Sequence, residues 1–299
     1  MKPDWKGVMP AITTPFTSSG SVDHAFLAKH ANWLIDAGCT GLVACGSLGE
    51  AATLTFEEKV AVVKTLTDAV GHRVPVMAGT AALSTQEAVA LARAVEGAGG
   101  TGLMVLPPYV YSTDWREMKA HVAAVISSTP LSCMLYNNPI AYRTDFVPWQ
   151  IAELASEHAN LHAVKESSAD VRRVTAIKAE LGSRLTITVG VDDALVEGVA
   201  AGAVGWVAGQ VNAFPRESVA LFNLALSGRW QEAFALNQWF LPLLRMDTVP
   251  KFVQLIKLCQ EAVGMGSAAV RPPRLPLAGT ELEQARREIA EALAVRPAL

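Results

Sequence analysis

The sequence has little excess charge and no long hydrophobic run. Its 299 residues carry a formal net charge of −3, with 18% charged and 51% hydrophobic residues. The absence of a basic stripe, an acidic tail or a low-complexity tract argues against a nucleic-acid partner and a disordered interaction tail. The first residues lack the apolar core of a signal peptide, and no apolar run approaches the roughly 20 residues of a membrane-spanning helix. We therefore expect a globular protein of the cytoplasm with no membrane partner.

Cysteine is scarce, and neither cysteine nor histidine occurs in a metal-binding pattern. The four cysteines are scattered without a C-x-x-C pair, and two fall inside apolar strand-like runs, which is typical of reduced, packed thiols. The six histidines show no H-E-x-x-H motif and no paired ligand spacing. We expect neither a disulfide nor a bound metal.

Short apolar runs alternate with amphipathic helical stretches along the first 210 residues. The stretch at 85–95, for example, is rich in alanine and apolar at i, i+3 and i+4. Eight strand–helix units predict an α/β fold, a (β/α)8 TIM barrel. The runs span residues 7–13, 41–45, 75–79, 102–106, 131–136, 161–165, 185–190 and 205–208.

Two further features bear on the architecture. A doubly wound sheet also alternates strands and helices, but it usually carries a glycine-rich fingerprint after its first strand, where this chain has T-T-P-F at residues 13–16. Residues 215–263 and 280–294 have helical patterns, which is more than one barrel helix requires. We therefore expect a single domain over residues 1–299, of which about 215–299 forms a C-terminal helical extension.

A lysine ends one of the apolar runs. Lys165 directly follows L-H-A-V at residues 161–164. Burial at the mouth of a packed core would lower its pKa and free the amine lone pair to attack a carbonyl or imine carbon. The alternative is a lysine that only reaches into solvent. Tyr136 ends the preceding run, so consecutive strands would place the two side chains next to each other.

A glycine-flanked serine follows the second run. In a (β/α)8 barrel the chemistry lies at the carboxyl ends of the strands and on the loops after them. The segment G-S-L-G-E at residues 46–50 allows a tight loop whose backbone N–H groups face a carboxylate, and the Ser47 hydroxyl can pass protons. Taken alone, the segment is also typical of a simple turn.

Three motifs resemble those of the dihydrodipicolinate synthase and N-acetylneuraminate lyase superfamily, in the same order and over nearly the whole chain: G-S-L-G-E at 46–50, Y-N-x-P at 136–139 and V-K-E at 164–166. The resemblance implies that Lys165 forms a Schiff base with a 2-oxo acid and that Tyr136 shuttles protons. It implies that Gly46, Ser47 and Leu48 bind the substrate carboxylate, with Ser47 also in the catalytic relay. It further implies no cofactor, and a homotetramer or homodimer.

The chain departs from the synthase pattern at three places. Leu48 replaces the second hydroxyl residue of the loop, and P-P-Y-V-Y at residues 107–111 separates two tyrosines that are adjacent in the synthase. The arginine after the Y-N-x-P motif is displaced to Arg143. These departures argue against a role in lysine biosynthesis.

A closer resemblance is to the branch that deaminates 1-pyrroline-4-hydroxy-2-carboxylate, an intermediate of hydroxyproline degradation. It implies a deaminase, a hydrolase of a C–N bond, that releases 2,5-dioxopentanoate and ammonia. Lys165 would add to carbon 2, Tyr136 with Ser47 would remove the carbon 3 proton, and the 4-hydroxyl would leave as water. The similar stretches are residues 45–50, 141–145, 165–173, 205–209 and 274–277.

The remaining substrate contacts are candidates only. Leu48 and Val207 would line a mostly apolar site. Asn138 and Arg143 are expected to contact a substrate hydroxyl or carboxylate, although Arg143 can equally form a surface salt bridge. Asp192, after the seventh run, is expected either to bind a distal hydroxyl or to cap the next helix.

Three rival classes stay open. A 2-oxo-3-deoxy sugar-acid dehydratase, or a pyruvate-dependent aldolase of the dihydrodipicolinate synthase type, would use the same Lys165 and Tyr136. A non-catalytic barrel that senses oxo acids would not need a lowered lysine pKa. A phosphate-binding barrel would need a glycine-rich turn after its last strands, where the bulky Trp206 stands among the glycines of 205–209.

Overall fold

Eight parallel strands form a single sheet in the computed structural model, which describes residues 1–108 and 114–299. The separated tyrosines at 109 and 111 lie outside these residues. The sheet order β1-β8-β7-β6-β5-β4-β3-β2 follows the chain around a ring. The strands are β1 (Gly7–Pro10), β2 (Leu42–Ala44), β3 (Val76–Gly79), β4 (Gly102–Val105), β5 (Ser132–Asn137), β6 (Leu161–Glu166), β7 (Thr186–Val189) and β8 (Gly205–Ala208).

The ring closes between its first two strands. Ala11 forms a parallel bridge with Val43, and the Ile12 amide donates to the Val43 carbonyl at 3.0 Å. The strands are buried on both faces, which is why they read in the sequence as continuous apolar runs. All eight lie within or next to the predicted segments, so the predicted (β/α)8 barrel is confirmed.

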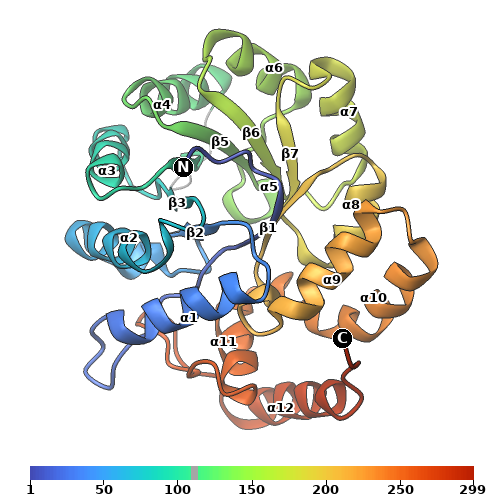
Figure 1. Ribbon diagram of the computed structural model, residues 1–299. Coiled ribbons are helices and arrows are strands. Elements are labelled where there is room, and N and C mark those ends of the chain that lie inside the picture. The colour runs from blue at the N-terminus through green and yellow to red at the C-terminus, as the bar shows by residue number, and fades with distance from the viewer. Residues whose placement is uncertain (109–113) are drawn as a thin grey trace.

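Helices surround the ring of strands (Figure 1). Several begin at a side chain that accepts a hydrogen bond from a free amide of the first turn, such as Asp23 for α1 and Thr55, in a capping box with Glu58, for α2. The outer helices are α1 (His24–Asp36), α2 (Phe56–Val70), α3 (Thr85–Gly97), α4 (Trp115–Ser127), α6 (Pro148–Glu157), α7 (Arg172–Leu181), α8 (Leu195–Ala200) and α9 (Pro215–Leu226). Short turns follow four strands at their carboxyl ends: η1 (Ala51–Thr53), α5 (Pro139–Tyr142), η2 (Asp192–Ala194) and η3 (Gln210–Asn212).

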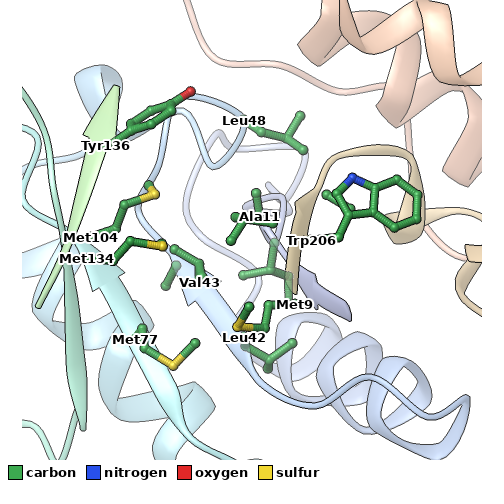
Figure 2. Packing of buried hydrophobic residues seen from close by; sticks show 14 of the residues in the cluster. Met9, Ala11, Leu42, Val43, Leu48, Met77, Met104, Met134, Tyr136 and Trp206 are labelled. Carbon is green, nitrogen blue, oxygen red and sulfur yellow. The ribbon is translucent and has the colours of Figure 1, made fainter. Parts of the chain in front are cut away.

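Methionines fill the barrel interior. Met9, Met77, Met104 and Met134 come from four different strands and are at most 2% exposed. Figure 2 shows Met104 and Met134 beneath the ring of Tyr136, towards the other end of the barrel from its hydroxyl group. Flexible thioethers fill irregular space well, so the core forms a closed floor under the carboxyl ends of the strands.

The C-terminal extension lies on one side of the ring (Figure 1). It consists of α10 (Trp230–Leu244), η4 (Arg245–Asp247), α11 (Phe252–Ala262) and α12 (Gly279–Ala294). The segment 215–299, which we expected as the extension, also contains α9; this helix packs against α8 and β1 in the place of the eighth barrel helix. Among the described residues, no helix is both long and apolar enough to cross a membrane.

A buried ion pair joins the extension to the loop after β2. Glu50 and Lys257 are 0% and 2% exposed, and the Lys257 ammonium donates to Glu50 Oε1 at 2.5 Å. The backbone amide of Arg271 donates to Glu50 Oε2 at 3.1 Å, and Lys257 also donates to the Ala269 carbonyl at 2.8 Å. The loop that carries Ser47 is therefore held from the far end of the chain.

We expect Lys257→Met to lower the free energy of unfolding by about 3–5 kcal/mol, because the buried Glu50 would lose its close partner and keep only the more distant Arg274, at 3.8 Å. The double variant Glu50→Gln/Lys257→Met should recover most of this loss, since both charges are removed. Unfolding in guanidinium chloride measures both values.

The control is Lys64→Met. Lys64 pairs with Asp68 on the surface of α2, where both side chains are more than half exposed. Removing such a pair should change the free energy of unfolding by less than about 1 kcal/mol. A double variant no more stable than Lys257→Met would contradict the assignment of the loss to the buried charge of Glu50.

Candidate functional site

The structure brings Lys165 and Tyr136 together at the carboxyl ends of β6 and β5. The two residues are direct partners in the parallel ladder. The Lys165 amine lies over the face of the Tyr136 ring, 4.5 Å from its centroid, and the two residues are only 6% and 5% exposed. The alternative of a lysine reaching into solvent is inconsistent with this burial.

Burial controls the charge of Lys165. Desolvation lowers the pKa of its amine to about 8, against the opposing attraction of Asp247 and Asp192, which favour the ammonium form. An ordinary lysine has a pKa of about 10.4. The neutral amine, which is the nucleophilic form, is therefore accessible near neutral pH.

The end of β7 leaves room for the Lys165 side chain. A Cβ atom at Gly190 would lie 2.6 Å from Lys165 Cε and 1.9 Å from Ser167 Oγ, so only glycine fits. Ser167 is 1% exposed, and within the described part of the chain its hydroxyl finds no hydrogen-bond partner of good geometry. Sequence analysis did not single out Ser167, although it lies two residues after the lysine.

The Tyr136 hydroxyl is held by a neighbouring amide. Asn138 Nδ2 donates to it at 3.0 Å, while Asn138 Oδ1 accepts from the Ala141 amide and caps α5. Burial raises the pKa of Tyr136 to about 12. Tyr136 therefore carries its proton near neutral pH and can donate it. Both polar groups of Asn138 are used within the protein, so the structure makes it a residue that positions Tyr136.

Ser47 is linked to Tyr136 through a residue that sequence analysis missed. The Ser47 and Tyr142 hydroxyls share a hydrogen bond, and the Tyr142 ring packs edge-on against Tyr136 with the centroids 5.6 Å apart. The Tyr142 hydroxyl also lies close enough to Tyr136 to lower its pKa. The sequence did indicate this residue indirectly, because Tyr142 directly precedes Arg143, which sequence analysis proposed as a substrate contact.

The other predicted contacts lie in different surroundings. Gly46 lies against Met104, whose Cε would be 3.3 Å from an added Cβ atom. Leu48 is buried at the same end of the barrel as the Tyr136 hydroxyl (Figure 2). Val207 is buried and pairs with Met9 across β8 and β1. Arg143 is exposed at the C-cap of α5, and within residues 1–108 and 114–299 it forms no ion pair.

Asp192 has a structural role that neither expectation described. Its carboxylate accepts hydrogen bonds from Trp206 Nε1 at 3.0 Å, from the Gly209 amide at 3.0 Å and from the Gln210 amide at 2.7 Å. It is 0% exposed and caps neither α8 nor η2. The carboxylate therefore ties the end of β7 to the end of β8.

The residues that the structure describes contain no cluster of three or more His, Cys, Asp or Glu side chains arranged to hold a metal ion. All four cysteines are buried free thiols. Burial raises the pKa of each thiol to about 12, so they are poor nucleophiles near neutral pH. Lys165 is the stronger candidate nucleophile.

Known proteins resemble this chain along most of its length. The model of the dihydrodipicolinate synthetase family matches residues 4–292. A 4-hydroxy-tetrahydrodipicolinate synthase of Sorangium cellulosum is 34% identical over 96% of this chain and 94% of its own. A dihydrodipicolinate synthase structure from Bacillus anthracis has a TM-score of 0.92 at 28% identity and covers 100% of both chains. A prophage protein of the dihydrodipicolinic acid synthase family from E. coli K12, solved with pyruvate, has a TM-score of 0.90 at 28% identity over 97% of this chain and 99% of its own.

The lowered pKa of Lys165 predicts its reactivity with pH. Labelling of this amine by a small anhydride should rise with pH to a midpoint near 8, because only the neutral amine reacts. Exposed lysines should have midpoints near 10.4. Mass spectrometry of the labelled peptides gives each midpoint.

Tyr136→Phe is the matched variant. It keeps the aromatic face under the amine and removes only a hydroxyl that is uncharged at this pH. The Lys165 midpoint should therefore stay within about half a pH unit of the wild-type value. A midpoint near 10 in the wild-type protein would show that burial does not control this amine.

The hydrogen bond between Ser47 and Tyr142 predicts non-additive variants. Ser47→Ala and Tyr142→Phe each remove that bond, so their double variant should lose less free energy of unfolding than the two single losses combined. The coupling should be about 0.5–1.5 kcal/mol. Urea unfolding of the four proteins measures it, and strictly additive losses would show that the two hydroxyls do not interact.

Proposed function

We propose a Schiff-base reaction for this chain, which belongs to the dihydrodipicolinate synthetase family. In this reaction Lys165 condenses with carbon 2 of a short 2-oxo acid of the pyruvate type, as in a lyase of this family. One observation carries the proposal: the Lys165 amine is buried, has a pKa lowered to about 8, and lies against the ring of a tyrosine that keeps its proton. A related fold has been solved with pyruvate, which supports this substrate class.

The proposed steps follow from the protonation states. The neutral Lys165 amine adds to the carbonyl carbon, and Tyr136 supplies the proton with which the former carbonyl oxygen leaves as water. The resulting iminium withdraws electrons from carbon 3 and acidifies its protons. Ser47 and the amides of its loop hold the carboxylate, and the hydrogen bond from Ser47 to Tyr142 extends the relay to the ring next to Tyr136.

A second candidate is the deamination of 1-pyrroline-4-hydroxy-2-carboxylate. The buried Leu48 favours it, because an apolar side chain stands where a synthase has a second hydroxyl beside the substrate. Here Lys165 adds to the ring imine, the ring opens, the 4-hydroxyl leaves as water, and hydrolysis then releases ammonia and 2,5-dioxopentanoate. The same amine and the same tyrosine serve both candidates, which differ in the leaving groups.

The oligomeric state stays a prediction. The family resemblance implies a homotetramer or a homodimer. The fold itself does not require assembly, because one structure of similar fold is described as a monomeric dihydrodipicolinate synthase variant.

Borohydride trapping tests the proposed function. Wild-type protein treated with pyruvate and borohydride should gain a covalent adduct on Lys165, because reduction fixes the iminium. Lys165→Ala should gain none. Lys59 is an internal control: it is also buried, but its ammonium donates to the Ala81 carbonyl and lies 3.8 Å from Glu87, so it should stay unmodified.

Product analysis then separates the candidates. Ammonia release from the hydroxypyrroline carboxylate selects the deaminase, and turnover of a 2-oxo-3-deoxy sugar acid selects a dehydratase or aldolase. An adduct without turnover of any such substrate identifies a binding protein. No adduct with pyruvate or with the hydroxypyrroline would rule out Lys165 as the nucleophile.

A further inference from the structure

Two carboxyl groups flank Gly209 at the end of β8. On one side, both oxygens of Asp192 accept from the Gly209 amide, at 3.1 and 3.0 Å. On the other side lies Asp247, the last residue of η4; a Cβ atom at Gly209 would be 2.3 Å from Asp247 Oδ1. The extension therefore places an acidic side chain at the mouth of the barrel, next to the carboxylate that joins β7 to β8.

These two carboxyl groups differ in their surroundings. Asp192 is fully buried, and its oxygens are occupied by an indole and two backbone amides. Asp247 is half-buried, and within residues 1–108 and 114–299 no group donates a hydrogen bond to its carboxyl oxygens. The carboxyl group of Asp247, unlike that of Asp192, can therefore form hydrogen bonds with a ligand.

The same surroundings favour the protonated form of Asp247. Burial and, after it, the negative charge of Asp192 raise the pKa of Asp247 well above its usual value, against the opposing effect of Lys165. Two carboxyl groups this close do not readily ionise together. Asp192, whose charge accepts several hydrogen bonds, has its pKa raised only to about 6.

Asp247 also lies near the reacting groups. When it is ionised, its charge is, after burial, the strongest influence on the pKa of Lys165, and it acts on the pKa of Tyr136 as well. The buried Ser167 hydroxyl stands beside Lys165 and close enough to Tyr136 to lower the pKa of Tyr136, but among the described residues it forms no hydrogen bond of good geometry. An acid and a hydroxyl without a well-oriented partner lie next to the same amine, which indicates that a polar group of the substrate, beyond the carbon bound by Lys165, completes the site.

We propose that the carboxyl group of Asp247 donates the proton with which the 4-hydroxyl of the lysine-bound substrate leaves as water, while Ser167 donates a hydrogen bond to the same part of the substrate. This inference rests on the Schiff-base reaction proposed above. Loss of a proton from carbon 3 gives the enamine. Its electrons then re-form the iminium at carbon 2, a double bond forms between carbons 3 and 4, and the bond from carbon 4 to oxygen breaks. The hydroxyl takes the Asp247 proton and leaves as water, and Asp247 becomes a carboxylate.

An acid at this position selects one outcome for the 4-hydroxyl. Aldol cleavage requires that hydroxyl to lose its proton while the bond between carbons 3 and 4 breaks. Dehydration requires it to gain one. Asp247 therefore directs the site towards loss of water, a step shared by the deaminase and by a 2-oxo-3-deoxy sugar-acid dehydratase, and away from aldol cleavage.

The test uses Asp247→Asn in the full-length protein, with 1-pyrroline-4-hydroxy-2-carboxylate in D2O. Asparagine keeps the shape and neutrality of the side chain but cannot transfer a proton. We expect deuterium exchange at carbon 3 and pyruvate trapping within about threefold of wild type, while ammonia release falls about 10²- to 10⁴-fold, the range for loss of a general acid. The adduct trapped by borohydride should retain the 4-hydroxyl, as its mass will show.

Asp193→Asn is the matched control. Asp193 adjoins Asp192 and lies 3.7 Å from Arg245, so it shares the acidic surroundings without lying against Gly209. It should release ammonia within about threefold of the wild-type rate, because Asp193 is the weakest of the influences that raise the pKa of Asp247. Ammonia release by Asp247→Asn within threefold of wild type, or equal losses of exchange and release, would overturn the role of Asp247.

Failure of the proposed function gives a different pattern, because it appears in the wild-type protein. If wild type is trapped by pyruvate but releases no ammonia, the same measurements with a 2-oxo-3-deoxy sugar acid test Asp247 through dehydration of that substrate. A trapped wild-type enzyme that removes water from neither substrate, or that cleaves the sugar acid between carbons 3 and 4, would overturn the inference while leaving the Schiff base intact.

Discussion

The chemistry of this barrel depends on a balance at one amine. Burial of Lys165 lowers its pKa, while Asp247 and Asp192 raise it, and the net result is a pKa of about 8. The opposing attraction is limited, because the Asp192 carboxylate accepts hydrogen bonds from three donors and burial beside Asp192 favours the neutral form of Asp247, which exerts no such attraction. A packed methionine floor also limits the water that would otherwise stabilise the ammonium form.

The C-terminal extension contributes to two sides of the barrel mouth. On one side it supplies Lys257, whose ion pair with Glu50 holds the loop that carries Ser47. On the other it supplies Asp247, which lies against Gly209 at the end of β8. A loop on a barrel strand would otherwise be free to move, and proton transfer is sensitive to errors of about 1 Å in position. The extension therefore acts as part of the site and not only as a cover for the barrel.

The fold could be predicted because its signal is local. Strands buried on both faces read as short apolar runs, and eight of them with helices between leave few architectures. The contact between Lys165 and Tyr136 was also predictable, since consecutive strands of such a barrel lie side by side. Both inferences need only the order of elements along the chain.

The parts of the site that sequence analysis missed depend on contacts between distant segments. Tyr142 reaches Ser47 because α5 is a single turn that brings the chain back over the barrel, while the neighbouring Arg143 lies exposed in a left-handed conformation. From the sequence, Asp192 was expected to cap a helix or to bind a substrate hydroxyl. Its hydrogen-bond partners instead lie on β8 and on the segment directly after it. The contact between Asp247 and Gly209 could not be predicted from sequence periodicity, because it depends on how the extension packs against the barrel.

The arrangement of acid and base groups follows from the order of the strands. Tyr136 belongs to β5 and Lys165 to β6, while Asp247 lies at the end of β8, so the lysine stands between the two proton-transferring groups. Elimination of water needs one group that takes a proton from carbon 3 and another that gives a proton to the leaving hydroxyl. If both were on one strand end, a proton could pass directly between them without reaction. Placing them on different walls of the barrel, with the covalently held substrate between, couples each proton transfer to a change in the substrate.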